Sequence, residues 1–489
     1  MQTAKQKLKR AAPWLFLLLV LAGLAAVRGL AANYEIGYEI MNGDFQNYNP
    51  VRHLLAGQVP YRDFTVYLGA GELYSVGGLL LVLGNSFGRS MFATNFCTWF
   101  YFELLVLAVC LVVIGTARAA RAAALALCSV FFAYVQGANL PFAGQVNTLL
   151  SYAAANGNSA RMMRSAALTL AVLVILLGLH FWQQDTSRRL LAPAVLVPFA
   201  AGFFVPGSND MGGAAYISIA LGYGLYLIRL YRSSIGKIVV QTLRYIVTSV
   251  VGLGVSVLLI SWGHPLAWLR QTRGTSAYQT WYYGNTLSDR VCSVADLHWP
   301  GAAVFCLAAA LAFAIGIFVC RSKRSAVSAA GGFALTLGMV LWNLLYGMVS
   351  ASNNGPTGGA AALAAVLAPA CIIKAVLLVC QKVSFPQVAA CIVPAGCAVL
   401  GAAVLAIGMA GQVQTRIGGH EGYTFVPELG GWIGDQAEKL ATEKELTAGK
   451  RLFGTYSSAL AAYRNGLHHP CPGGSPTPGV PANLPAGKF

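Results

Sequence analysis

Charged residues are scarce in this sequence: Asp, Glu, Lys and Arg make up 10% of 489 residues, whereas hydrophobic residues make up 57%. Ordinary soluble domains carry about 25% charged residues. This shortage excludes a typical soluble protein and, with a mean hydropathy of +0.62, predicts many membrane-spanning helices. The sequence also lacks an internal repeat and a soluble catalytic domain.

Cysteine chemistry has little support. Most of the eleven cysteines lie inside apolar segments, with no CxxC pair and no Cys/His spacing of the kind that binds zinc. Because a free thiol packs as a small hydrophobic group, we interpret these cysteines as buried packing residues. We predict no metal site among them.

Acidic residues are fewer than basic ones, 16 against 33, and the formal net charge is +17. Such an excess can indicate nucleic-acid binding, but here the basic residues stand at the ends of apolar segments instead of covering one helix face. We therefore predict membrane lipids as partners and no nucleic acid.

We predict an all-α polytopic membrane protein with about eleven spans of roughly 20 residues. A basic N-terminus precedes the first, which we interpret as a retained signal anchor. The stretch 71–83 is too short to cross and is expected to be a surface helix. The predicted spans are 13–32, 91–115, 121–137, 163–182, 190–206, 214–230, 238–262, 301–320, 325–350, 359–380 and 388–411.

Charge supports this topology. The predicted inner loops hold basic groups such as Arg118 and Arg121 and one acid, Asp185, whereas the outer segments hold acids and bases in similar numbers. This distribution obeys the positive-inside rule. A twelfth span at 71–83 would reverse every later loop and destroy it. We therefore expect a plasma membrane protein, in the bacterial inner membrane, with a cytoplasmic N-terminus and an external C-terminus.

The expected organisation is a transmembrane domain over 1–411 and an external tail over 412–489. Within the domain, the polar content gathers in a first external loop at 33–90, which carries surface helices, and a long external loop at 263–300. In the tail, 432–462 has a helical charge pattern. After about residue 470, the Pro- and Gly-rich composition predicts disorder.

The first external loop is rich in acids: Glu35, Glu39, Asp44, Asp63 and Glu72. A carboxylate at a membrane interface is costly to desolvate, so it usually serves pairing, metal binding or proton transfer. We interpret Glu35 and Glu39 as solvated loop residues. An acid such as Asp44, just after the first span, is placed to deprotonate an acceptor hydroxyl.

The stretch from Gly43 to Phe64, GDFQNYNPVRHLLAGQVPYRDF, resembles the first outer loop of GT-C glycosyltransferases, which use polyprenyl-phosphate-linked sugars. Relatives include protein O-mannosyltransferases and the aminoarabinose transferase of lipid A. In this superfamily an aspartate follows the first span, and many bacterial members then have a segment like AGQVPYRDF and a short surface helix. In this sequence the aspartate position is held by Asp44, the AGQVPYRDF segment is residues 56–64, and the surface helix corresponds to residues 69–84.

This resemblance implies an inverting transfer of a sugar from a polyprenyl-phosphate carrier to a hydroxyl of an envelope glycan, lipid or protein, outside the plasma membrane. Asp44 is then the catalytic base. Many members have a second acid directly after the first, but this sequence has Phe45, which argues against a metal at Asp44. No cofactor is predicted with certainty, and a divalent metal, Mg²⁺ or Mn²⁺, stays open.

The leaving phosphate needs cationic stabilisation, and Arg62, Arg270 and Arg273 are the available cations. Another interpretation of Arg270 and Arg273 is anchoring to lipid headgroups. The remaining substrate-binding candidates are Tyr61, Asp63, Asp210 and Tyr282. Asp63 is also expected to hold the PYRDF turn, and Tyr282 to join an interfacial aromatic belt.

Two functions of other classes compete with a transferase. A transporter or lipid flippase should carry polar groups near the bilayer midplane and often two related halves. Here Glu103 is the main charge inside a span. The third alternative is a non-catalytic subunit of envelope assembly, which would keep the fold without needing Asp44.

Overall fold

The computed structural model describes residues 2–32, 35–36, 44–66, 69–114, 116–144, 195–208, 234–282, 389–418, 422–427, 429–434 and 437–448, with scattered positions at 146–150, 212–227 and 366–377. The predicted spans 163–182, 301–320 and 325–350 lie outside the described residues. So do most of 214–230 and 359–380, and the tail after residue 448.

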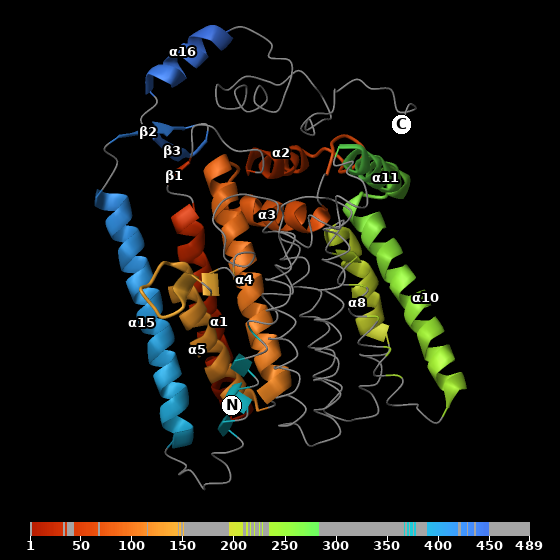
Figure 1. Cartoon of the computed structure of the whole chain (residues 1–489), viewed down its shortest axis with the longest axis vertical. Helices are drawn as coiled ribbons and strands as arrows, with labels where there is room; N and C mark the ends of the chain where they lie inside the picture. Colours follow the sequence, from red (N-terminus) through yellow and green to blue (C-terminus); the bar gives the residue numbers. More distant parts are fainter. Residues whose placement is uncertain are drawn as a thin grey trace.

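Long apolar helices form the body of the protein (Figure 1). Among the described residues, 5 helices are long and apolar enough to cross a membrane. They belong to α1 (Gln2–Ala32), α4 (Phe87–Ile114), α5 (Ala117–Val135), α10 (Ile235–Ile260) and α15 (Ala389–Gly418). The shorter α8 (Val197–Phe203) and η2 (Val205–Gly207) cover part of the span expected at 190–206. The prediction of an all-α, multi-span membrane protein is confirmed.

Aromatic and aliphatic side chains of α1, α4 and α5 form the main core. Trp99, Phe102 and Phe132 are almost completely buried there, and Trp99 lies 5.3 Å from Phe102 and 6.2 Å from Phe132 between ring centroids. On α15, Gly401 lies so close to α5 that an added Cβ would stand 2.7 Å from a methyl group of Leu125. Small residues thus bring α15, the last described span, against α5 and α1, as is usual for helices in membranes.

Hydrogen bonds between helix ends fix the direction of each span. We call the face where α1 ends at Ala32 the rim face, and the opposite face the basal face. The guanidinium of Arg416, in the last turn of α15, donates to the Leu30 carbonyl at 3.0 Å. Gly88 of α4 donates to Leu429 of the rim at 2.7 Å, and Tyr74 donates to the last residue of α10, Ile260, also at 2.7 Å.

These contacts bring the ends of α1, α10 and α15 and the start of α4 to the rim face. At the basal face, the ammonium group of Lys374 donates to the Ile114 carbonyl at the end of α4, at 2.7 Å. Each of these helix directions is the one that the eleven-span topology expects. With α1 ending and α4 starting at the same face, the segment 71–83 between them cannot cross the membrane.

Basic residues predicted for the inner face gather at the basal face. Arg121, in the first turns of α5, lies 4.7 Å from the ring centroid of Trp14, and Arg118 donates to the sulfur of Cys391 at 3.3 Å. Both contacts join the start of α5 to neighbouring spans. Packing and membrane topology therefore use the same cations.

Three helices form a layer at the rim face: α2 (Asp44–Leu55), α3 (Ala70–Leu83) and α11 (Pro265–Tyr282). Figure 1 shows α2 and α3 running across the ends of the long helices. α3 buries Leu73, Val76 and Leu80 and leaves Leu81 and Val82 exposed, so it has one covered face. The predicted surface helix at 71–83 is confirmed, and α2 is a second helix of the first external loop, for which surface helices were expected. α11 is a helix within the segment 263–300, which we had described only as a loop.

A small sheet closes the rim beside the layer, with strand order β1-β3-β2. β1 (Glu35–Ile36) pairs in parallel with β3 (Gly431–Gly434), and β2 (Tyr423–Val426) pairs antiparallel with β3. The expected helix at 432–462 is wrong at its start, because Trp432 lies in β3 and α16 spans Ala437–Thr447. Gly430 takes a φ of 63°, which favours a hairpin turn there over a continuous helix.

Candidate functional site

The predicted base, Asp44, is the first residue of α2 at the rim face. The helix therefore starts at the predicted base, which stands where backbone N–H groups face outward and favour negative charge. The placement of the Asp44 side chain lies outside what the structure describes. The proton-transfer role thus stays a prediction from sequence.

The end of α2 is set by glycine. The backbone N–H of Gln58 donates to the His53 carbonyl at 3.1 Å, and the backbone N–H of Gly57 donates to the Leu54 carbonyl at 2.9 Å. This pair of bonds, with Gly57 at a φ of 80°, is the Schellman ending of a helix. The Ala-Gly of AGQVPYRDF therefore stops α2 and turns the chain toward the next segment.

The segment Val59–Phe64, which we call the Arg62 turn, closes on itself by backbone and side-chain bonds. The Asp63 amide donates to the Val59 carbonyl at 2.9 Å, and the Val59 amide donates to Oδ2 of Asp63 at 2.8 Å. Tyr61 donates to Phe64 at 3.1 Å. The prediction that Asp63 holds the PYRDF turn is confirmed.

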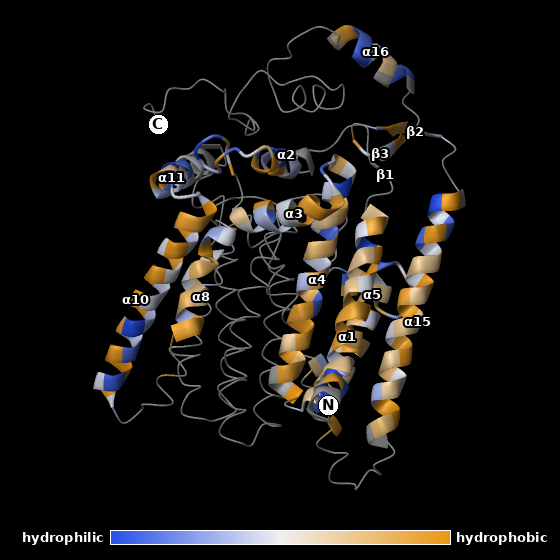
Figure 2. Ribbon diagram, turned by 180° about the vertical axis from the view of Figure 1, so that it is seen from behind, coloured by the Kyte–Doolittle hydropathy of each residue, from blue (hydrophilic) through white to orange (hydrophobic). Residues whose placement is uncertain are grey.

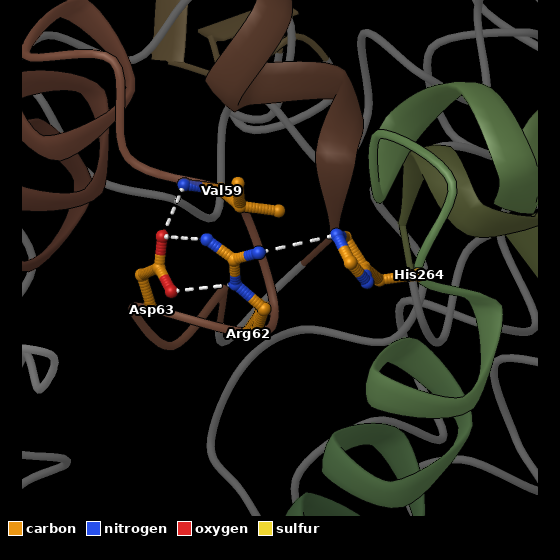
Figure 3. Close-up of polar contacts among 4 residues, drawn as sticks. All are labelled: Val59, Arg62, Asp63 and His264. Atoms are coloured by element: carbon orange, nitrogen blue, oxygen red, sulfur yellow. Dashed lines mark hydrogen bonds and ion pairs between the residues drawn. The ribbon is translucent and has the colours of Figure 1, made fainter.

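Arg62 and Asp63 form a two-pronged ion pair (Figure 3). Nε of Arg62 donates to Oδ1 at 2.8 Å and Nη2 to Oδ2 at 2.9 Å. These bonds, followed by that of the Val59 amide, lower the pKa of Asp63 to about 2, and the Asp63 bond raises the pKa of Arg62. The cation stays charged, and half of its side-chain surface is exposed.

Arg62 also reaches across to the start of α11. Its Nη1 atom lies 3.3 Å from Nε2 of His264, the residue just before that helix (Figure 3). A guanidinium can only donate, so this contact needs His264 Nε2 as the acceptor. Sequence analysis missed His264; the only local signal is Pro265 after it, which suits the first position of a helix.

Tyr61 is held in an unusual conformation inside the rim layer. Its φ is 66°, the left-handed region that costs a non-glycine residue roughly 1–2 kcal/mol. The side chain is only 7% exposed, and burial raises the pKa of its hydroxyl far above the ordinary value. Among the described residues this hydroxyl finds no hydrogen-bond partner. A buried polar group without a partner is uncommon, so this atom is a candidate contact for a bound molecule.

α11 docks on the Arg62 turn along one face. Ala267 and Trp268 pack against the cluster that contains Tyr61 and Phe64, while Nε2 of Gln271 donates to the Val66 carbonyl at 2.9 Å. These positions recur every three or four residues, as on one side of a helix. The long external loop and the first external loop therefore meet in the folded protein.

The other predicted site residues are not brought to this contact. Arg270 and Arg273 lie on α11 but are exposed, on the side away from Ala267 and Trp268. Tyr282 is the last residue of α11, and its side chain is not described. Asp210 lies outside the described residues. The structure thus brings Tyr61, Arg62 and Asp63 together and leaves the arginines of α11 at the surface.

The described residues contain no group of three His, Cys, Asp or Glu side chains that could hold a metal ion. Glu103 lies within α4, completely buried, and its Oε1 atom accepts the indole N–H of Trp99 at 2.8 Å. Its contact is with its own helix, one turn away. Among the described residues, Glu103 thus has a hydrogen-bond partner for Oε1 within its own span and none for Oε2.

No family model and no curated protein sequence matches the chain. Among solved structures, the chain is similar to the crystal structure of ArnT from Cupriavidus metallidurans bound to undecaprenyl phosphate. The two chains share 12% sequence identity over 94% of this chain and 85% of that chain, with a TM-score of 0.47. The bound lipid phosphate is a property of that protein.

Proposed function

We propose that this protein is an inverting glycosyltransferase of GT-C type, which moves a sugar from a polyprenyl-phosphate carrier to an acceptor hydroxyl at the external face of the plasma membrane. The observation that supports this most is the arrangement at the rim face: α2 begins at Asp44 and ends in the turn that carries Arg62. An acid at the start of α2 and a cation in the turn after its end thus flank one helix of the rim face, where a lipid-borne donor can meet a water-borne acceptor.

The chemistry requires one proton acceptor and one stabilised leaving group. The acceptor hydroxyl gives its proton to Asp44 as its oxygen forms a bond to the anomeric carbon. The bond between that carbon and the phosphate oxygen breaks on the opposite face of the sugar, and its electron pair stays on the phosphate. The anomeric configuration is therefore inverted.

Arg62 is the cation that we assign to the leaving phosphate. Asp63 occupies two N–H groups of its guanidinium and fixes its plane, and His264 accepts a third from Nη1, while the exposed part of the side chain offers the other two N–H groups. Fixed donors are effective because they need no rearrangement as negative charge develops. Asp63 is then a positioning residue for Arg62, and Tyr61, in the same turn, is a proposed substrate contact. Asp210 and Tyr282 remain proposed substrate contacts.

The test is a donor panel. Purified protein in detergent or vesicles is supplied with different polyprenyl-phosphate sugars and candidate acceptors, and release of the polyprenyl phosphate is followed together with sugar transfer. We expect one donor class to be consumed only when an acceptor is present. Transport of the intact lipid-linked sugar across vesicles without loss of the sugar would instead identify a flippase, and no reaction or movement with any donor would favour an assembly subunit.

A further inference from the structure

The exposed face of α11 combines apolar and basic side chains in a helical pattern. Leu266 is 72% exposed and Leu269 is 56% exposed, and Arg270 and Arg273 are exposed beside them. Spacings of three and four residues place all four on one side of the helix. The opposite side packs on the bundle through Trp268 and its neighbours. This side of α11 is therefore a separate surface from the Arg62 contact.

The position of this face in the fold indicates the medium that it meets. α10 is a spanning helix with only 28% of its apolar window buried, and its last turn still exposes Leu258 and Leu259. The chain then bends at Trp262, which is 45% exposed and has a φ of 48°, and enters α11. Exposed apolar side chains thus continue from the last turn of α10 to Leu266 and Leu269 of α11. Figure 2 shows that α10 leads directly to α11 at the rim face.

Charge gives the face its selectivity. The sequence of α11, PLAWLRQTRGTSAYQTWY, contains Arg270 and Arg273 and no Asp or Glu. The arginines follow the two leucines by one turn, so the leucines can enter the acyl boundary while the guanidinium groups stay at headgroup level. Arginine is well suited to bind phosphate oxygens through two N–H groups at once. Neutral lipids would offer the leucines the same contact but no net charge to the arginines.

We infer that α11 is an interfacial helix whose Leu266, Leu269, Arg270 and Arg273 face binds the anionic phospholipid headgroups of the leaflet at the rim face. On its other face Gln271, together with His264 just before the helix, holds the first external loop. The helix thus connects the lipid surface to the Arg62 turn. This inference needs only the membrane-spanning fold and stands apart from sugar transfer.

The experiment places an environment-sensitive fluorescent amino acid at position 269 and uses vesicles with equal amounts of phosphatidylglycerol and phosphatidylcholine. Bromine, which quenches the fluorophore on contact, is carried by one lipid or by the other. Because each basic residue adds to the attraction for anionic lipid, we expect phosphatidylglycerol to be enriched near the probe by on the order of tenfold. Equal quenching by the two lipids, or no quenching by either, would overturn the inference.

Matched variants test whether Arg270 and Arg273 cause the preference for phosphatidylglycerol. R270Q/R273Q should remove it, whereas K9Q/R10Q loses the same charge near the start of α1 and should keep it. R270K/R273K keeps both charges and should retain most of the preference, which serves as the readout if the glutamine variant does not fold. Retention in R270Q/R273Q would contradict the assignment. If one equivalent of polyprenyl phosphate abolished the preference in the parent protein, these arginines would belong to the donor and the inference would fail, with the proposed transferase unaffected.

Discussion

The guanidinium of Arg62 and the imidazole of His264 lie 3.3 Å apart, although 202 positions separate them in the chain. Arg62 belongs to the turn after α2, and His264 stands at the junction of α10 and α11. The bond therefore joins the element that carries the proposed base to the helix that we assign to the lipid surface. Predictions for individual residues follow from this arrangement.

Replacing the proposed base should separate catalysis from folding. Asp44→Asn removes the proton acceptor while keeping size and polarity, so we expect transfer to fall by at least about 100-fold, the usual contribution of a general base. Sugar transfer and polyprenyl phosphate release are measured beside membrane insertion and melting temperature. Glu438→Gln, an acid at the start of α16, is the matched control and should keep its activity. Full activity in Asp44→Asn would reject the base assignment.

The Tyr61 hydroxyl offers a test of substrate contact. Because it has no partner among the described residues, Tyr61→Phe should leave the melting temperature nearly unchanged. If the hydroxyl binds the donor or the acceptor, KM for that substrate should rise by about fivefold, the loss of one neutral hydrogen bond. A clear loss of stability with KM unchanged would instead assign the hydroxyl to a buried water.

Stability near the Arg62 turn should depend on pH through Asp63. Its pKa is lowered to about 2, and an unfolded aspartate titrates at about 3.9. A depressed folded-state pKa adds stability above the unfolded value, and this contribution is lost as the pH falls from about 4 through 2. Melting curves of the parent and of Asp63→Asn should therefore differ at pH 7 and converge toward pH 2. A gap that stays constant across this range would contradict the ion pair.

Two glycines of α10 give a matched test of span packing. A Cβ at Gly252 would overlap the Phe199 carbonyl oxygen, whereas nothing lies within 4 Å of a Cβ at Gly254. Gly252→Ala should push α8 from α10 and cost about 1–3 kcal/mol. Gly254→Ala should be neutral or stabilising, because alanine favours helix. Thermal stability in detergent distinguishes them, and equal melting temperatures would show that the two helices separate freely.

Membrane topology can be tested with reporters. β3 pairs with β1, so the segment after α15 shares the rim face with the segment after α1. A reporter fused after Phe489 should be accessible from outside the cell, and one inserted at Thr116, between α4 and α5, should not. A cytoplasmic signal from the first reporter would overturn the eleven-span topology.

Some features of this fold were predictable because they depend on local composition. The length and apolarity of α1, α4 and α10 determine that these helices span a membrane, whatever their neighbours are. The shortness of 71–83 was enough to make α3 a surface helix. The Pro and Asp of PYRDF similarly predicted a closed turn, since their bonds are made within a few residues.

Other features depend on contacts between distant segments, and no local pattern encodes those. Trp432 begins a segment with a helical charge pattern, yet pairing with 35–36 and 423–426 places it in a strand. The tertiary structure alone decided that His264 meets Arg62, and that α11 turns Gln271 toward the bundle and Arg270 away from it. The sequence by itself determined that α1, α4, α5, α10 and α15 are apolar and long enough to cross a membrane, because transfer free energy sums along the chain. Which side chains contact each other at the rim face was decided only by the packing of the spans, because that packing brings the ends of distant helices together.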